Sequence, residues 1–375
     1  MRPILFKIPA LPLLIACLLV AVIAIVRDVV PWKSKGKKPV FPMTSVWALA
    51  GAAAVLRLIG KFGVEGADVM ANLRVGFVPI YAYGVMLGTS LVVGWFIAMH
   101  LAKQDGIDQQ EAGSLYMWGA VWSIIGSRLL WYFTTPSATI GDIPLINQGG
   151  LVAYGGMIGG TLATWYCCRK RGIPLLQWAD VAAPSVVLGT AITRIGCFLF
   201  GCDYGKPSHL PWAVQFPKGS PAWHHHVAQT VDRLPETAAW SYPVHPTQIY
   251  ESLVGLSLFA LLMLIRRYRT FSGQVFVGWV VGYGVLRSLI EQYRDDTDRG
   301  LYRLPIFDSE VSTSTIIGVV SAILGLGLLA FLMRKYRRDP EGSRLWLQPV
   351  AATGGGGQGG QRKVEQGGGK RRKRH

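Results

Sequence analysis

The sequence predicts an all-α integral membrane protein built as a polytopic helix bundle, and composition and charge pattern support this. Hydrophobic residues make up 51% of the chain and charged residues only 16%, against about 25% charged residues in a typical soluble domain. Several apolar stretches approach the roughly 20 residues that a transmembrane helix needs. The net charge of +17 is concentrated in short basic runs between these stretches. This pattern follows the positive-inside rule and argues against a nucleic-acid partner, since no soluble domain is visible to present the charge.

Nine stretches are predicted to cross the membrane. Seven of them form a core at residues 77–335, and two precede it in an N-terminal extension at residues 1–76. The predicted spans are residues 10–26, 43–60, 77–100, 115–133, 150–168, 178–200, 248–265, 274–291 and 314–333. The first stretch is not expected to be a cleaved signal peptide, because no small-x-small cleavage site follows it.

The basic loops predict the orientation of the bundle. If the lysine-rich loop at residues 33–38 is cytoplasmic, alternation of the spans places three further basic runs on the same side, at residues 169–171, 266–269 and 334–338. The N-terminus then lies outside the cytoplasm and the C-terminus lies inside it.

Two segments are expected to lie outside the membrane. Residues 201–247 are rich in Pro, Trp, His and Tyr and carry few basic residues, which predicts a small extracytoplasmic cap region. Residues 353–375 are glycine-rich and end in a basic run. They are predicted to form a disordered cytoplasmic tail against the anionic leaflet.

Charged side chains inside predicted spans are the first candidates for function, since charges in lipid are costly. Arg194 lies about two turns inside the outer end of its span. It either snorkels to the headgroups or presents its planar fork to a phosphate group. Tyr283, Arg287 and Glu291 recur every fourth residue and so share one helix face. Arg287 and Glu291 form either a structural pair or, together with Arg194, an anion site.

Two further motifs have both a structural and a functional interpretation. The segment 149–160, GGLVAYGGMIGG, contains overlapping GxxxG pairs that begin at Gly155 and Gly156. They favour close helix packing, or they leave backbone near a ligand beside Tyr154. The segment HPTQIYES begins at His245 and has the proline of a helix start. It is a simple helix start or part of a site.

Histidines and cysteines do not predict a metal site. The histidines at 224–226 are consecutive, so they cannot all face one ion in regular structure. The five cysteines show no CxxC pair. Cys197 and Cys202 are expected to be free thiols that point apart, because they lie five residues apart on a predicted helix.

Residues 77–335 resemble the prolipoprotein diacylglyceryl transferase family in the order and spacing of several short motifs. These motifs are IYAYGVMLG, IIGSRLLWYF, GGLVAYGGMIGG, DVAAPSVVLGTAITRIGCF, PWAVQFP, HPTQIYE and YGVLRSLIEQYR. The resemblance implies an enzyme of the bacterial inner membrane that needs no metal or organic cofactor. Its members transfer the diacylglyceryl group of phosphatidylglycerol to the lipobox cysteine of a prolipoprotein signal peptide and release glycerol phosphate.

The resemblance also implies roles for individual residues. The arginine of the family's Gly-Arg-x-Gly-Asn-Phe signature falls on Arg194, and its second essential arginine falls on Arg287. The implied lipid-binding residues are Arg194, Arg287, Tyr83, Tyr283, Gly155 and Gly205. Three positions differ from the family. Tyr154 stands where the family has histidine, Cys197 replaces the signature asparagine, and Cys202 replaces the signature glutamate.

These differences affect the expected chemistry. A thiol has a pKa near 8.5 and needs a base or a positive field to ionise. A tyrosine is a poor base, so Tyr154 is expected to donate a hydrogen bond to the phospholipid, which leaves Glu291 or His245 as the base. Two other hypotheses remain. One is a diverged paralogue without transferase activity or with another lipid substrate. The other is a transporter, which would predict internal repeats that are not seen.

Overall fold

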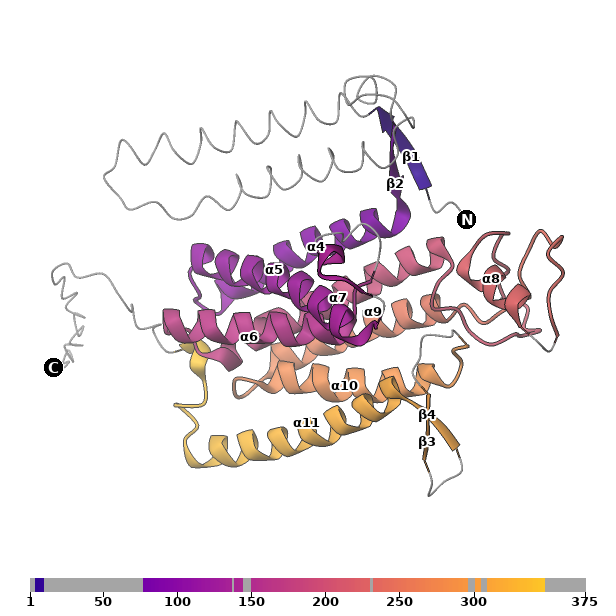
Figure 1. Cartoon of the computed structure of the whole chain (residues 1–375). Helices are drawn as coiled ribbons and strands as arrows, with labels where there is room; N and C mark the ends of the chain where they lie inside the picture. Colours follow the sequence, from indigo (N-terminus) through magenta and orange to yellow (C-terminus); the bar gives the residue numbers. More distant parts are fainter. Residues whose placement is uncertain are drawn as a thin grey trace, which may run out of the picture. The chain divides into compact units, whose positions relative to one another are not determined.

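The computed structural model describes residues 4–9, 77–136, 138–143, 150–229, 232–295, 301–304 and 309–347. Long helices dominate these residues (Figure 1). The long helices are α4 (Ala82–Gln104), α5 (Gln109–Thr134), α6 (Ala153–Arg171), α7 (Leu175–Phe200), α9 (Thr247–Tyr268), α10 (Gln274–Glu291) and α11 (Thr313–Arg338). The short ones are η1 (Ile140–Asp142), α8 (Pro221–Ala228) and η4 (Leu345–Leu347).

The chain divides into two compact units. The first comprises Met1–Ala102 with Ala179–Arg344, and the second comprises Lys103–Trp178 with Leu345–His375. Helices α4, α7, α9, α10 and α11 belong to the first unit, and α5 and α6 belong to the second.

Four of the described helices, α4, α7, α9 and α11, are long and apolar enough to cross a membrane. This confirms the prediction of an integral membrane protein with an α-helical framework. Helices α5, α6 and α10 coincide with three further stretches that the sequence predicts as spans. The two N-terminal spans predicted at residues 10–26 and 43–60 lie outside the described residues.

Two short antiparallel sheets add to the helical framework, and the sequence did not predict them. Strand β1 (Ile4–Pro9) pairs with β2 (Phe77–Tyr81), and β3 (Leu301–Leu304) pairs with β4 (Ser309–Ser312). The stretch predicted as a span from residue 77 therefore begins as a strand, and its helix begins at Ala82. Pairing with β1 keeps Phe77–Tyr81 extended, and Pro79 also disfavours helix at residue 78, the residue before it.

Apolar side chains from α7, α9 and α10 form the core of the first unit. Its buried residues are Ala183, Val187, Leu258, Leu262 and Val275. Small residues let the helix backbones approach each other closely. A Cβ added to Gly255 of α9 would lie 2.9 Å from Cβ of Ala191 on α7, and one added to Gly284 of α10 would clash with the carbonyl of Gly318 on α11.

A buried carboxylate joins α7 to the start of α10. Asp180 is fully buried, and its two oxygens accept hydrogen bonds from the backbone N–H groups of Gly273 (2.8 Å) and Phe276 (2.9 Å). Nη1 of Arg269 lies 3.6 Å from the same carboxylate. The Asp180 side chain therefore caps the N-terminus of α10 from a neighbouring helix, because free N–H groups at a helix start need acceptors.

Glycines bring α5 and α6 into close contact within the second unit. A Cβ added to Gly155 would clash with the carbonyl of Gly126, and one added to Gly159 would clash with the carbonyl of Trp122. Of the two interpretations of the GxxxG pairs, the structure thus supports close packing. Arg128 of α5 is buried and donates to the carbonyls of Asp142, Ile143 and Gly150 at 2.6–3.1 Å.

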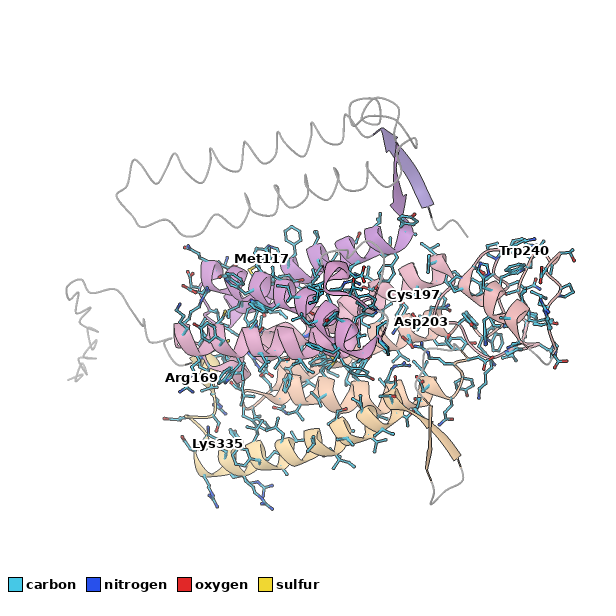
Figure 2. All side chains as sticks on the ribbon, in the orientation of Figure 1. Met117, Arg169, Cys197, Asp203, Trp240 and Lys335 are labelled. Atoms are coloured by element: carbon cyan, nitrogen blue, oxygen red, sulfur yellow. The ribbon has the colours of Figure 1, made fainter. Side chains whose placement is uncertain are left out.

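Residues 201–229 and 232–247, with α8, form a small folded region at one end of α7 and α9 (Figure 1). Tyr204, Phe216, Ala222 and Val244 make up its buried core. Trp240 of this region lies at the opposite end of the first unit from Lys335 near the end of α11 (Figure 2). The cap region and a basic run thus lie at opposite ends of the same helices.

His226 is fully buried in the cap region. Its Nδ1 accepts a hydrogen bond from the Tyr242 N–H at 3.3 Å, while Nε2 is buried without a partner in the described structure. Burial, helped by the neighbouring His225, lowers the pKa of His226 to about 4. Protonation would place a hydrogen on Nδ1 and break the bond from Tyr242.

We expect acid to loosen the cap region through His226. The pKa of His226 is lower in the folded cap than in the unfolded chain, so the unfolded chain binds more protons as the pH falls. The stability of the cap is therefore fully present above about pH 6.5 and is lost as the pH approaches about 4. Hydrogen exchange of the α8 amides, corrected for intrinsic rates, should report this loss. His226→Gln should remove the dependence and exposed His224→Gln should preserve it. If hydrogen exchange in His226→Gln kept the pH dependence of the wild type, His226 would not be the cause of that dependence.

Candidate functional site

Glu251 on α9 is the centre of a buried cluster of charges in the first unit. Its Oε2 pairs with Nε of Arg194 on α7. Its Oε1 lies 3.2 Å from Nη1 of Arg287 on α10 and 3.3 Å from Nη1 of Arg294. One carboxylate thus contacts three arginines, and its side chain is only 7% exposed.

Two further carboxylates complete the cluster. Asp203 follows α7 and pairs with Nη1 of Arg194 at 2.8 Å and with Nη2 of Arg294 at 2.5 Å. Burial opposes the ionisation of Asp203, but the two arginines more than offset it and hold the pKa of this carboxyl well below its usual range. Glu291 lies 2.7 Å from Nη1 of Arg287.

Three arginines therefore face three carboxylates, and the cluster is neutral in total. The sequence pointed to Glu291 as the partner of Arg287 and to no partner for Arg194. The structure shows that Arg194 pairs with Glu251 and Asp203. The reason is that the chain turns back after α7 and α9 begins beside it, which sequence spacing does not reveal.

Not every donor in the cluster is used. No described residue accepts a hydrogen bond from Nη2 of Arg194, whose side chain is 18% exposed. Oε1 of Glu291 has no hydrogen-bond partner in the described structure. The cluster therefore offers one donor group without a hydrogen bond and one buried acceptor atom without a hydrogen bond.

The end of α7 brings two thiols together. Gly201 has a left-handed φ of 86°, and the N–H groups of Gly201 and Cys202 both donate to the Cys197 carbonyl. The side-chain donor atoms of Cys197, Cys202 and Asp203 consequently lie within 4.8 Å of one another. The expectation that the thiols point apart was wrong, because the helix ends between the two cysteines. Both cysteines are free.

Residues from the HPTQ segment hold this turn in place. The hydroxyl of Thr247 donates to the Asp203 carbonyl at 2.7 Å, and Nε2 of Gln248 donates to the Cys202 carbonyl at 2.6 Å. Gly205 donates its N–H to the His245 carbonyl. A Cβ on Gly205 would lie 2.7 Å from the His245 Cβ. This glycine is therefore required for close packing of the turn.

The other predicted site residues of the first unit lie around the cluster. Tyr83 on α4 packs beside Gly196 and lies within electrostatic reach of Arg194 and Asp203. Tyr283 on α10 lines a cavity of about 30 Å³ together with Glu251 and Arg287. Nδ1 of His245 lies 3.3 Å from the Tyr250 hydroxyl, outside the ion-pair network.

The remaining predicted site residues, Tyr154 and Gly155, lie at the start of α6 in the second unit. Gly155 contacts the α5 backbone. Their assignment to the lipid site stays a prediction.

Arg294 is the functional candidate that sequence reasoning missed. It lies just beyond the last residue of α10 and is only 4% exposed. Its spacing was the available signal, since Arg287, Glu291 and Arg294 stand at i, i+4 and i+7, which is one helix face. In the sequence Glu251 is only part of the HPTQIYES segment, and its central place follows from tertiary contacts.

Loss of the central carboxylate should destabilise the first unit. Glu251→Gln removes a charge shared by three arginines, and removing one partner of a buried pair costs about 3–5 kcal/mol. Thermal unfolding of the purified protein in detergent should show a clear loss of stability. Glu236→Gln is the control, since its pair with Arg233 is exposed and should contribute no more than about 1 kcal/mol. Equal stability of the two variants would refute the central role of Glu251.

Comparison with known proteins identifies the family. The family model described as prolipoprotein diacylglyceryl transferase matches residues 70–331. The chain is similar to a protein from Finegoldia magna named phosphatidylglycerol–prolipoprotein diacylglyceryl transferase, with 28% identity over 70% of this chain and 93% of the relative. A relative of the same name from Clostridium tetani shares 31% identity over 69% of this chain and 95% of its own length. A relative of the same name from Frankia alni shares 34% identity over 67% of this chain and 64% of its own length. The chain therefore belongs to the prolipoprotein diacylglyceryl transferase family.

Proposed function

We propose that this protein transfers the diacylglyceryl group of phosphatidylglycerol to the lipobox cysteine thiol in the signal peptide of a prolipoprotein, with release of glycerol phosphate. Membership of the family and the names of its relatives support this function. The apolar helices support an enzyme whose lipid substrate stays in the membrane.

The open Nη2 group of Arg194 is the observation that carries the proposal. Carboxylates pair with Nε and Nη1 of this guanidinium group. These two ion pairs fix the direction in which its remaining N–H donors point. A phospholipid phosphate accepts such donors readily, because arginine offers a planar fork. Arg287 supports the same site through the shared Glu251. As the ester bond breaks, these cations stabilise the charge that grows on the phosphate.

The acceptor thiol needs to lose its proton during the transfer. Glu291 is the better-placed base, since its Oε1 has no partner among the described residues, whereas His245 faces Tyr250. Tyr83, Tyr283 and Gly205 complete the lipid site beside the arginine cluster. For Tyr154 and Gly155, in the second unit, the hydrogen bond to the phospholipid and the lipid contact stay separate predictions.

The proposed setting is the bacterial inner membrane. The core at residues 77–335 spans it seven times, and residues 201–247 form an extracytoplasmic cap. The C-terminus is cytoplasmic. Basic residues in the last turns of α6, α9 and α11 support this orientation.

The two arginines should not tolerate lysine. Arg194→Lys and Arg287→Lys keep the positive charge but lose the planar fork, so each should insert normally and lose most transfer activity. Lipidation of a prolipoprotein in membranes from cells depleted of their own transferase measures the effect. Arg233→Lys, at an exposed pair, should retain activity. Near-normal activity in both buried-site variants would leave these arginines as structural charges.

Tyr154→His should be tolerated or should raise transfer activity, because it introduces a group that titrates near pH 6.5. The same lipidation assay, run between pH 6 and 8, measures the change. Tyr166→His, on the exposed surface of the same helix, should leave the activity unaltered. Complete loss of activity in Tyr154→His alone would mean that the phenol is indispensable to the pocket. Wild-type protein that inserts but never lipidates a precursor would instead favour the diverged paralogue.

A further inference from the structure

Arg128, in the second half of α5, is a buried cation that the proposed function does not use. It is only 3% exposed. Its Nη2 donates to the carbonyl of Asp142 at 2.6 Å, its Nε to that of Ile143 at 3.1 Å and its Nη1 to that of Gly150 at 2.8 Å. Each nitrogen of the guanidinium group thus has a backbone acceptor, an arrangement that the planar fork of arginine permits and a lysine ammonium does not. The side chain therefore joins α5 to the residues that precede α6.

Trp131 and Gly150 enclose this guanidinium group. The guanidinium carbon lies 4.0 Å from the centroid of the Trp131 ring, in the geometry of a cation–π contact. Gly150 has a left-handed φ of 73°, and a Cβ on it would lie 2.6 Å from Nη1 of Arg128 and 2.5 Å from the Trp131 ring. Only glycine can therefore bring the backbone this close. We call Arg128, Trp131 and Gly150 the arginine clamp.

The arginine clamp leads directly into α6. Two residues after Gly150, the N–H group of Val152 donates to the carbonyl of Ser127 on α5 at 3.2 Å. Val152 is the N-cap of α6 and makes no side-chain hydrogen bond to the helix, whereas a polar N-cap side chain usually fixes a helix start. The start of α6 is therefore held by contacts with α5 rather than by a cap of its own.

Tyr154 is the second residue of α6, so its position depends on this helix start. Each residue of an α-helix advances the chain by about 1.5 Å and turns it by about 100°. If the start of α6 shifted or rotated, the phenol of Tyr154 would move with it. A displacement of about 1 Å in an active site can lower a rate roughly 100-fold. A fixed helix start thus matters for any reaction in which Tyr154 takes part.

We infer that Arg128 is a positioning residue for the transfer reaction, because it fixes the place at which Tyr154 meets the phospholipid. The inference rests on the proposed function and on the separate prediction that Tyr154 donates a hydrogen bond to that lipid. Arg128 acts through the helix start, since its three nitrogens donate to backbone carbonyls. The motif IIGSRLLWYF contains Arg128 and Trp131, and the family resemblance assigned neither of them a role.

The effect of the arginine clamp on α6 can be measured without a transfer assay. In the full-length protein in detergent, Arg128→Lys keeps the charge but cannot reproduce the fork of donors. The amides of Val152, Gly155 and Gly156, which are hydrogen-bonded at the helix start, should then exchange their hydrogens at least about tenfold faster. Arg169→Lys, at an exposed position near the other end of α6, is the matched control and should leave these exchange rates unaltered.

A double-mutant cycle tests the link to the reaction. Arg128→Lys should lower lipidation of a prolipoprotein at least about tenfold, and Tyr154→Phe should lower it by removing the hydroxyl that the clamp positions. In the Tyr154→Phe background, Arg128→Lys should have less than about a twofold further effect, because the effects of coupled residues are not additive. Arg169→Lys should leave lipidation unchanged in both backgrounds. A residue that only stabilised the fold would lower lipidation equally in both.

Gly150→Ala guards against loss of the fold in Arg128→Lys. It keeps the arginine, but its Cβ would strike Nη1 of Arg128 and the Trp131 ring. It should therefore give the same faster exchange and the same dependence on Tyr154. The inference is overturned if a folded clamp variant exchanges like the wild type, or if it lowers lipidation equally with and without the Tyr154 hydroxyl. Wild-type protein that lipidates no precursor would overturn the proposed function and the role of Tyr154, whereas the exchange rates would still test the clamp.

Discussion

The ion pairs of Glu251 are the interaction on which the rest of the site depends. A single carboxylate on α9 contacts Arg194 from α7 and Arg287 from α10, and it also contacts Arg294 just after α10. Such charges persist in an apolar protein only when each is paired, because an unpaired buried charge costs several kcal/mol. The ion pairs of Glu251 therefore hold α7, α9 and α10 next to one another. Asp203 belongs to the same network, so the turn after α7 is held in place as well.

Neutrality within the cluster explains how so much charge can lie between apolar helices. Every arginine has a carboxylate partner, yet Nη2 of Arg194 remains open among the described contacts. Under the proposed function, an anionic lipid headgroup would approach this donor without displacing the pairs that hold the helices. Lipid binding and stability would then use different atoms of the same guanidinium group, because arginine carries five donors in one plane.

The sequence predicted the helical framework and two of the three arginines, because charges within apolar stretches and polar residues at every fourth position are local signals. It missed the role of Glu251 and the approach of Cys197 to Cys202. Both depend on where α7 ends, and a left-handed residue at Gly201 is difficult to distinguish from any other glycine in a sequence. It also placed the start of α4 too early, since strand pairing with β1 is a contact between distant segments. Local periodicity identifies faces of helices, whereas their ends are decided by tertiary contacts.

Asp180 has a consequence for the alignment of the site. It fastens the start of α10 to α7 through Gly273, and both helices then run to the arginine cluster. Arg194 lies 14 residues after Asp180, and Arg287 lies 14 residues after Gly273, a rise of about 21 Å in each case. The two helices therefore place their arginines at equal distances along the helix axes from the contact between Asp180 and Gly273. One residue inserted into α10 would raise its arginine by about 1.5 Å and rotate it by about 100°, so helix length is itself a determinant of the active centre.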